Sequence, residues 1–252
     1  MRYHLRLRTP ALPRMRLDKF LCESTDFTRS MARSALARGE ITVNGEVVKR
    51  ATYVVQDTDA VAWEGEPLAI IGLRHLMLNK PAGYECTNKT SQHPSVMDLL
   101  DVEKRDRLHT VGRLDVDTTG LLLITDDGQW THRVISPRHQ TDKVYLATLA
   151  EPLPDDAVQR FADGMLLKHE DEAVLPAHLE VVDPTTARVT VQEGKYHQIK
   201  RMFGALGNRV VTLHRERIGS VVLDPDLAPG ESRYLTDAEV QSLGGMEPGE
   251  TA

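Results

Sequence analysis

The chain has 252 residues, which leaves room for one large domain or two unequal ones at roughly 150 residues per domain. Apolar residues make up 40% and charged residues 27%, as in an ordinary globular protein, and the net charge is −6, which by itself argues against a nucleic-acid partner. No apolar run reaches the ~18 residues of a membrane span, and the cysteines Cys22 and Cys86 have no CxxC spacing, so we expect no membrane association and a reducing, cytoplasmic compartment.

Residues 1–14 are basic and contain Pro10 and Pro13, but they have no continuous apolar stretch of the kind found in a signal peptide. We expect a disordered extension there, with Met15 as a candidate for the start of the folded protein.

A small α+β module is predicted over residues 15–63. Apolar residues at helical spacing indicate two short helices, one with Leu17, Phe20 and Leu21 and one with Met31, Ala35 and Leu36. Thr28 or Ser30 is placed to cap the start of the second helix, and Gly39 is placed to end it. Two short apolar runs around Asn44-Gly45 then predict a β-hairpin.

The module is basic although the whole chain is acidic. Residues 1–62 carry 11 Lys/Arg and 7 Asp/Glu, whereas residues 63–252 carry 20 and 30. Arg29 and Arg33 are four residues apart and share a helix face. Charge alone leaves two interpretations open, a face that binds RNA phosphates or a solvated basic face. The candidate RNA-binding residues are Arg16, Lys19, Arg29, Ser30, Arg33, Arg38 and Lys49.

Residues 64–74 contain two glycines and a proline and are predicted to form a linker. A larger unit follows over residues 75–243. Its candidate strands cover 75–79, 121–125, 143–149, 174–182, 187–192 and 209–213, and its candidate helices cover 129–135, 155–163 and 197–206. This pattern predicts an α+β domain with a mixed, mostly antiparallel sheet, followed by a disordered polar tail over 244–252.

Residues 109–120 form a loop rich in Asp, Thr and Gly that leads into the apolar run 121–124. This placement holds the carboxylate of Asp115 at the edge of a strand that is predicted to be buried. A polar turn that satisfies its own backbone would explain the same residues. A third interpretation is a metal-dependent phosphodiesterase that uses Asp115, Asp117, Asp126 and Asp127, although residues 126–128 are explained more simply as a turn.

Four motifs in order resemble those of the pseudouridine synthases. They are residues 79–83 (NKPAG), 112–121 (GRLDVDTTGL), 143–145 (KVY) and 194–202 (GKYHQIKRM). The pattern of residues 16–45 (RLDKFL, then RS, AL, G and VNG) resembles the S4 RNA-binding domain. Residues 125–139 and 213–219 (LHRERIG) are similar to the branch of the family that modifies small-subunit (16S) ribosomal RNA.

The resemblance implies the site. Asp115 would attack C1′ of a uridine or remove a proton from its ribose. The base of this uridine would have left the RNA stack and would stack on Tyr145 instead. Burial disfavours an ionised carboxylate, and the family uses a cation to counteract this. By alignment that cation is Lys200, with Arg201 as the second choice. Ile199 would pack behind Tyr145.

The remaining candidates for substrate contacts are cations in an otherwise acidic domain: Arg113, Arg133, Arg138, Lys143, Lys195, Arg201 and Arg215. The resemblance implies no cofactor and no metal, and we expect a monomer whose partner is ribosomal RNA. Relatives in the same branch act on large-subunit RNA or tRNA, and a non-catalytic S4-type RNA-binding protein is a further alternative.

Overall fold

A computed structural model describes residues 14–89, 92–168 and 170–244. The chain divides into two compact units, Met1–Arg74 and His75–Ala252, and each is described by itself. The extension predicted for 1–14 and the tail predicted for 244–252 lie almost entirely outside the described residues.

The small unit contains the two predicted helices, α1 (Leu17–Ser24) and α2 (Arg29–Arg38). The Thr28 hydroxyl caps α2 by accepting from the Met31 N–H at 3.3 Å, and Gly39 ends it with a φ of 79°. The predicted hairpin joins β2 (Ile41–Val43) to β3 (Glu46–Val47) through Asn44 and Gly45, both at positive φ. The other strands are β1 (Met15–Arg16), β4 (Val54–Val55), β5 (Val61–Trp63) and β6 (Glu66–Pro67).

The predicted linker starts too early. Glu66–Pro67 pairs with β5 as an edge strand, and Leu68 and Ile70 pack against the core of the small unit. Gly65 lies at positive φ in the turn between the two strands. Because glycine is common in turns and in linkers alike, the sequence of this segment did not distinguish between them. The boundary between the units follows Arg74.

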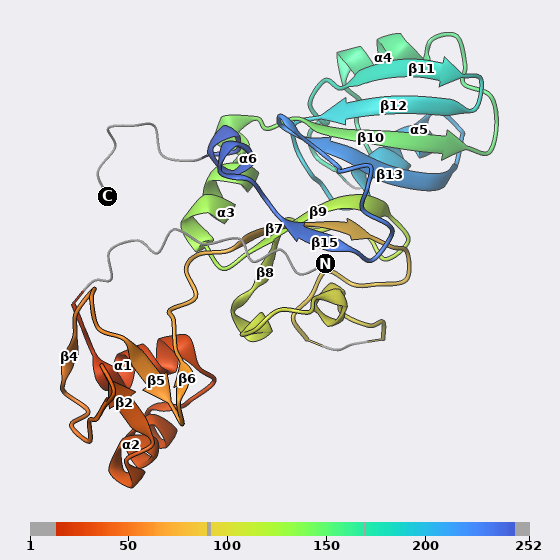
Figure 1. Cartoon of the computed structure of the whole chain (residues 1–252). Helices are drawn as coiled ribbons and strands as arrows, with labels where there is room; N and C mark the ends of the chain where they lie inside the picture. Colours follow the sequence, from red (N-terminus) through yellow and green to blue (C-terminus); the bar gives the residue numbers. More distant parts are fainter. Residues whose placement is uncertain (1–13, 90–91, 169, 245–252) are drawn as a thin grey trace. The chain divides into compact units, whose positions relative to one another are not determined.

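The larger unit is built on one nine-stranded sheet in the order β11-β12-β10-β13-β9-β7-β15, with β8 paired to β9 and β14 paired to β13 (Figure 1). The pairing is antiparallel except between β9 and β13, so the sheet is mixed and mostly antiparallel, as predicted. The strands are β7 (His75–Lys80), β8 (His109–Val111), β9 (Thr119–Thr125), β10 (Lys143–Leu149), β11 (His178–Asp183), β12 (Thr186–Val191), β13 (Val210–Ile218), β14 (Val221–Val222) and β15 (Ser232–Tyr234).

The helices of the larger unit are α3 (Gly128–Ile135), α4 (Ala157–Asp163), α5 (Gln198–Ala205) and α6 (Asp237–Ser242), with short 3-10 turns at Val96–Leu99, Arg105–Arg107 and Pro137–His139. Two predicted strands need correction: the strand placed at 174–182 begins at His178, and the strand placed at 209–213 continues to Ile218. The charged run 214–217 hid this continuation, because it breaks the apolar pattern. Strands β8, β14 and β15 and helix α6 had no prediction.

Both faces of the central strands are covered, which explains the unbroken apolar run of β9. Leu122 and Ile124 join a core with α4 and α5, where Phe161 and Phe203 lie 5.0 Å apart, whereas Leu121 and Leu123 join a second core with α3 and α6. Figure 1 shows α3 beside α6, and the Trp130 indole N–H joins them by donating to the Val240 carbonyl at 3.0 Å. Among the described residues, no helix is long and apolar enough to cross a membrane.

An ion pair fixes the start of α6 and gives the first prediction. Arg233 donates from both terminal nitrogens to Glu239, at 2.9 and 2.8 Å, and this hydrogen bonding, together with the Thr236 capping box, lowers the pKa of Glu239 to about 2. The folded-state pKa is depressed, so the stabilisation is present above the ordinary pKa of Glu, near 4.5, and is lost as the pH falls towards about 2.

We therefore expect Glu239→Gln to lower the free energy of unfolding by about 1–2 kcal/mol at pH 7, because a partly exposed pair retains only part of its electrostatic energy. Denaturant unfolding at pH 7 and pH 3 tests this, and the gap between variant and wild type should narrow at pH 3. Asp237→Asn, in the same helical turn, is the control. An equal gap at both pH values would contradict the assignment.

Candidate active site

The loop that carries Asp115 joins β8 to β9, and hydrogen bonds from a buried lysine fix its backbone. Lys80 is 0% exposed, and its ammonium donates to the carbonyls of Pro81, Val116 and Thr118 at 3.0, 3.1 and 2.8 Å. Burial lowers the pKa of Lys80. Because one ammonium binds both ends of the turn that follows Asp115, the carboxylate has a fixed position at the strand edge.

Gly120 allows β9 to run close beside β13. Its φ is +101°, and a Cβ there would lie 2.3 Å from the Arg215 carbonyl oxygen, so a side chain would force the two strands apart. The close approach permits the parallel pairing of Gly120 with Arg215. The glycine of this motif therefore places β13 next to the Asp115 loop.

Each carboxylate oxygen of Asp115 has a nitrogen atom of a basic side chain beside it. Lys200, in the first turn of α5, donates from Nζ to Oδ2 at 2.8 Å, and His197 Nε2 lies 3.4 Å from Oδ1. Lys200 also bonds to Asp117 at 2.6 Å. His197 has a left-handed backbone (φ 49°) just before α5, and its ring stacks on Tyr196 with centroids 3.8 Å apart.

The charges of this cluster support one another. Burial tends to lower the pKa of Lys200, but hydrogen bonds to Asp115 and Asp117 outweigh it and raise the pKa overall. Burial tends to raise the pKa of Asp117, and the Lys200 ammonium outweighs it and lowers the pKa. An ionised Asp117 and a protonated Lys200 are therefore the stable states at neutral pH.

Asp115 opens into a cavity of about 1000 Å³. Tyr145 on β10 forms part of its wall with 9% exposure, and Ile199 lies in the same apolar cluster as Tyr145. Cations that line it are Arg113, Lys143, Lys195, Lys200 and Arg215. The aromatic ring of this cavity is suited to stack on a planar nucleobase, and its cations are suited to bind the phosphates of the same nucleotide strand.

Three predicted substrate contacts do not line this cavity. Arg133 donates to the Gly244 carbonyl, and Arg201 donates to Glu170 at 2.7 Å and to the Lys168 carbonyl at 2.6 Å, so both have structural partners. Arg138 is exposed next to Pro137, which does line the cavity. Arg215 is 3% exposed inside the protein, so it is not a surface phosphate contact.

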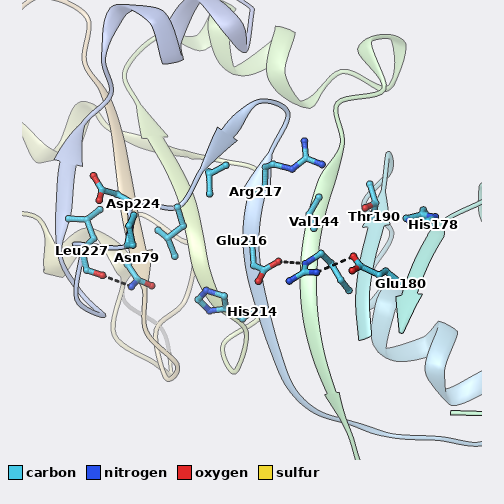
Figure 2. A pocket seen from close by; sticks show the side chains of 14 residues that line it. Asn79, Val144, His178, Glu180, Thr190, His214, Glu216, Arg217, Asp224 and Leu227 are labelled. Atoms are coloured by element: carbon cyan, nitrogen blue, oxygen red, sulfur yellow. Dashed lines mark hydrogen bonds and ion pairs between the residues drawn. The ribbon is translucent and has the colours of Figure 1, made fainter. Parts of the chain in front are cut away.

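A second hollow, about 680 Å³, lies on the opposite face of the sheet, because neighbouring residues of β13 point to opposite sides: His214 and Glu216 line it, whereas Arg215 lines the Asp115 cavity. In Figure 2, dashed lines connect Glu180 and Glu216 to the arginine that lies between them, which is Arg188. The Arg188 guanidinium is thus shared by two carboxylates of this hollow.

The acidic residues proposed for a phosphodiesterase are separated by role. Asp127 caps α3 by accepting from the N–H groups of Gln129 and Trp130 at 2.9 Å, and Asp115 and Asp117 share Lys200. Within the described residues, no group of three His, Cys, Asp or Glu side chains is placed to hold a metal ion.

Comparison with known proteins decides the family. Residues 74–205 match the family model of RNA pseudouridylate synthases, and residues 15–61 match the S4 domain. The ribosomal small subunit pseudouridine synthase A of Yersinia pestis is 51% identical over 231 residues, which cover 91% of this chain and 98% of that protein. The chain belongs to the pseudouridine synthases.

Further relatives agree with this assignment. The protein of the same name from Escherichia coli K12 is 50% identical over 91% of this chain and 100% of its own. A crystal structure of a pseudouridylate synthase aligns with a TM-score of 0.67 and 46% identity, over 91% of this chain and all of that one. The chain is thus an isomerase of the pseudouridine synthase family with an N-terminal S4 domain.

Sequence reasoning missed two groups of this synthase site. His197 lies within the motif at 194–202 and Lys80 lies within the motif at 79–83, so the signal was present for both, but spacing along the chain does not tell which member of a motif reaches a carboxylate. Their contacts depend on the left-handed backbone at His197 and on the burial of Lys80.

Removing the buried ammonium gives the second prediction. We expect Lys80→Met to lower the free energy of unfolding by about 2–4 kcal/mol and the synthase rate at least tenfold, because two carbonyls of the Asp115 turn and the Pro81 carbonyl lose their donor. Thermal melts and nucleoside analysis of treated RNA measure the two effects. Lys89→Met, at an exposed neighbouring site, is the control. Unchanged stability in Lys80→Met would contradict this role.

Proposed function

We propose that this synthase converts a specific uridine of small-subunit ribosomal RNA to pseudouridine, with Asp115 as the reacting carboxylate. The observation that carries the proposal is the Asp115–Lys200 contact of 2.8 Å in the wall of a cavity that Tyr145 also lines. The choice of RNA is supported by relatives about 50% identical that are named for the ribosomal small subunit.

The reaction needs one carboxylate and no redox step. Either Asp115 attacks C1′ and displaces the base from N1, or it removes the C2′ proton and the base is eliminated; C5 of the same base then bonds to C1′. Lys200 and His197 orient the Asp115 carboxylate, Tyr145 offers a stacking surface, and Arg113 and Lys195 at the cavity contact phosphates. No cofactor takes part in this scheme.

The S4 domain supplies sequence-independent affinity for RNA. All six of the predicted cations are exposed, but Arg16 is paired with Asp18 and Arg38 with Glu40, whereas Lys19, Arg29, Arg33 and Lys49 are in no ion pair found among the described residues. These four cations are therefore the stronger part of the predicted RNA-binding set. We propose that the protein acts as a monomer in the cytoplasm, where ribosomal RNA is made.

The test is to incubate the protein with protein-free small-subunit RNA, partly assembled small subunits, large-subunit RNA and tRNA, and to map pseudouridines by carbodiimide-dependent stops of primer extension. We expect one new stop, confined to small-subunit RNA. A stop in large-subunit RNA or tRNA alone would overturn the proposed substrate and leave the reaction intact.

The exposed cations give the third prediction. The double variant Arg29→Ala/Arg33→Ala should weaken RNA binding and lower the slope of log Kd against log salt by roughly 0.7–0.9 for each lost contact. Filter binding at several salt concentrations measures the slope. Arg160→Ala, which removes an arginine from α4 in the larger unit, should leave the slope unchanged. An unaltered slope in the double variant would mean a solvated basic face.

A further inference from the structure

Arg215 is a buried cation whose hydrogen bonding is incomplete. Its Nε donates to the Leu121 carbonyl at 2.7 Å, and its Nη1 donates to the Tyr145 hydroxyl at 3.3 Å. Nη2 is buried and has no hydrogen-bond partner among the described residues. A buried donor without a partner is costly, and such groups in native structures call for an explanation such as a catalytic role.

The charge of Arg215 is also unmatched. Within the described part of the chain, no carboxylate forms an ion pair with it, although the side chain is 3% exposed. Arg215 helps, after burial itself, to lower the pKa of the neighbouring Lys143, which shows that positive charge is concentrated at this wall. Among the residues that the structure describes, this buried guanidinium therefore has no carboxylate that balances its charge.

The position of Arg215 is fixed on three sides. The backbone of Arg215 on β13 pairs with Tyr145 on β10 and with Gly120 on β9. Its guanidinium carbon lies 5.8 Å from the centre of the Tyr145 ring. Both Arg215 and Tyr145 line the cavity that contains Asp115. A base that stacks on Tyr145 would thus bring its edge towards the guanidinium.

The reaction creates the missing charge. When the bond between N1 and C1′ breaks, the electron pair stays on the base, and the uracil anion spreads it over N1, O2 and O4. On the first route, C1′ then forms a bond to Asp115. On the second route, Asp115 takes the C2′ proton and a double bond forms between C1′ and C2′. Both routes produce the same anion, which then bonds through C5 to C1′. This breaks the ester bond to Asp115 or, on the other route, consumes the double bond as Asp115 returns the proton to C2′. The base afterwards loses the C5 proton and gains one at N1.

We propose that Arg215 is a further catalytic residue, whose Nη2 donates to a carbonyl oxygen of the uracil and stabilises the negative charge that develops there as the base departs. A fixed donor that faces developing charge in a site shielded from water stabilises the transition state more than the bound substrate. This inference rests on the proposed function in taking uridine as the substrate.

The experiment compares leaving groups. Single-turnover cleavage of the N1–C1′ bond is measured on a short RNA copy of the mapped site that carries uridine or 5-fluorouridine, by loss of the nucleoside from nuclease digests. The proteins are wild type, Arg215→Met and Arg215→Lys. Arg188→Met is the matched control, because that arginine lies on β12, which β10 separates from β13, and pairs with Glu180 and Glu216 at the opposite face of the sheet (Figure 2).

With uridine, we expect Arg215→Met to lower the rate by roughly 10²–10³-fold, as for the loss of one oxyanion donor, and Arg215→Lys to lower it less because the charge remains. With 5-fluorouridine both losses should be at least tenfold smaller, since the fluorinated base is a better leaving group and needs less stabilisation. The Kd for RNA should change less than threefold, and Arg188→Met should stay within twofold of wild type.

Equal losses with the two nucleosides, or a loss confined to Kd, would overturn the proposal and leave Arg215 a structural or RNA-binding residue. If Arg215→Met does not fold, the same ratio of losses measured on Arg215→Lys decides. A wild-type protein that cleaves neither RNA would instead overturn the proposed function, so the two failures are distinguishable.

Discussion

Replacing Asp115 by asparagine is expected to abolish pseudouridine formation while the protein stays folded and binds RNA. The amide is nearly isosteric with the carboxylate, but it can neither attack C1′ nor accept a proton. Lys200 would lose its ion pair, and Lys200 and His197 would keep their positions on and next to α5. Nucleoside chromatography of digested RNA should find less than a few per cent of the wild-type rate.

Asp155→Asn, at an exposed position ahead of α4, is the matched control and should leave the rate unchanged. Asp115→Asn should melt close to wild type, because the carboxylate that it replaces is partly exposed at a loop. Residual turnover above a few per cent in a folded variant would contradict the role of Asp115.

The second large effect is expected at Lys200. Lys200→Met removes the ammonium 2.8 Å from Asp115, which disfavours the ionised carboxylate in a partly buried site. We expect a loss of about 10²-fold at neutral pH, in line with a hydrogen bond to a charged group. The acidic limb of the pH–rate profile should move to higher pH, and activity should partly recover there as the carboxylate ionises.

Arg201→Met provides the comparison, because Arg201 follows Lys200 directly and points elsewhere. Its guanidinium bonds to Glu170 and to the Lys168 carbonyl, and it does not line the cavity. Its loss should lower stability and leave the position of the acidic limb unchanged. A profile shifted by Arg201→Met and untouched by Lys200→Met would show that the partner of Asp115 is wrong by one residue.

Local signals carried much of the fold. The Asn44-Gly45 turn, the Thr28 cap and the Gly39 stop were predictable because each depends on the conformational preference of the residue itself. The end of β13 was not, because its residues Arg215 and Glu216 look like a surface segment. Both residues nevertheless belong to β13, where Arg215 lines the Asp115 cavity and Glu216 lines the cavity on the opposite face of the sheet. Only the pairing of strands in the folded protein reveals this.

The site divides in the same way. The motifs brought attention to Asp115, Tyr145 and Lys200, and the structure has all three around one cavity. Charge alone could not sort the arginines: Arg133 and Arg201 have structural partners, whereas Arg215 is buried against Tyr145. A single sequence records the charge of each arginine, but its depth and its partners arise from strands and helices that are far apart along the chain.

Release of tritium from RNA labelled at C5 of uridine tests the central claim most directly, because the C5–H bond must break when C5 joins C1′. Wild type, Asp115→Asn and Asp155→Asn are incubated with labelled small-subunit RNA in excess EDTA. We predict one equivalent of tritium per RNA from wild type and from Asp155→Asn, and none from Asp115→Asn. Release by Asp115→Asn at the wild-type rate, or none by wild type, would contradict the claim.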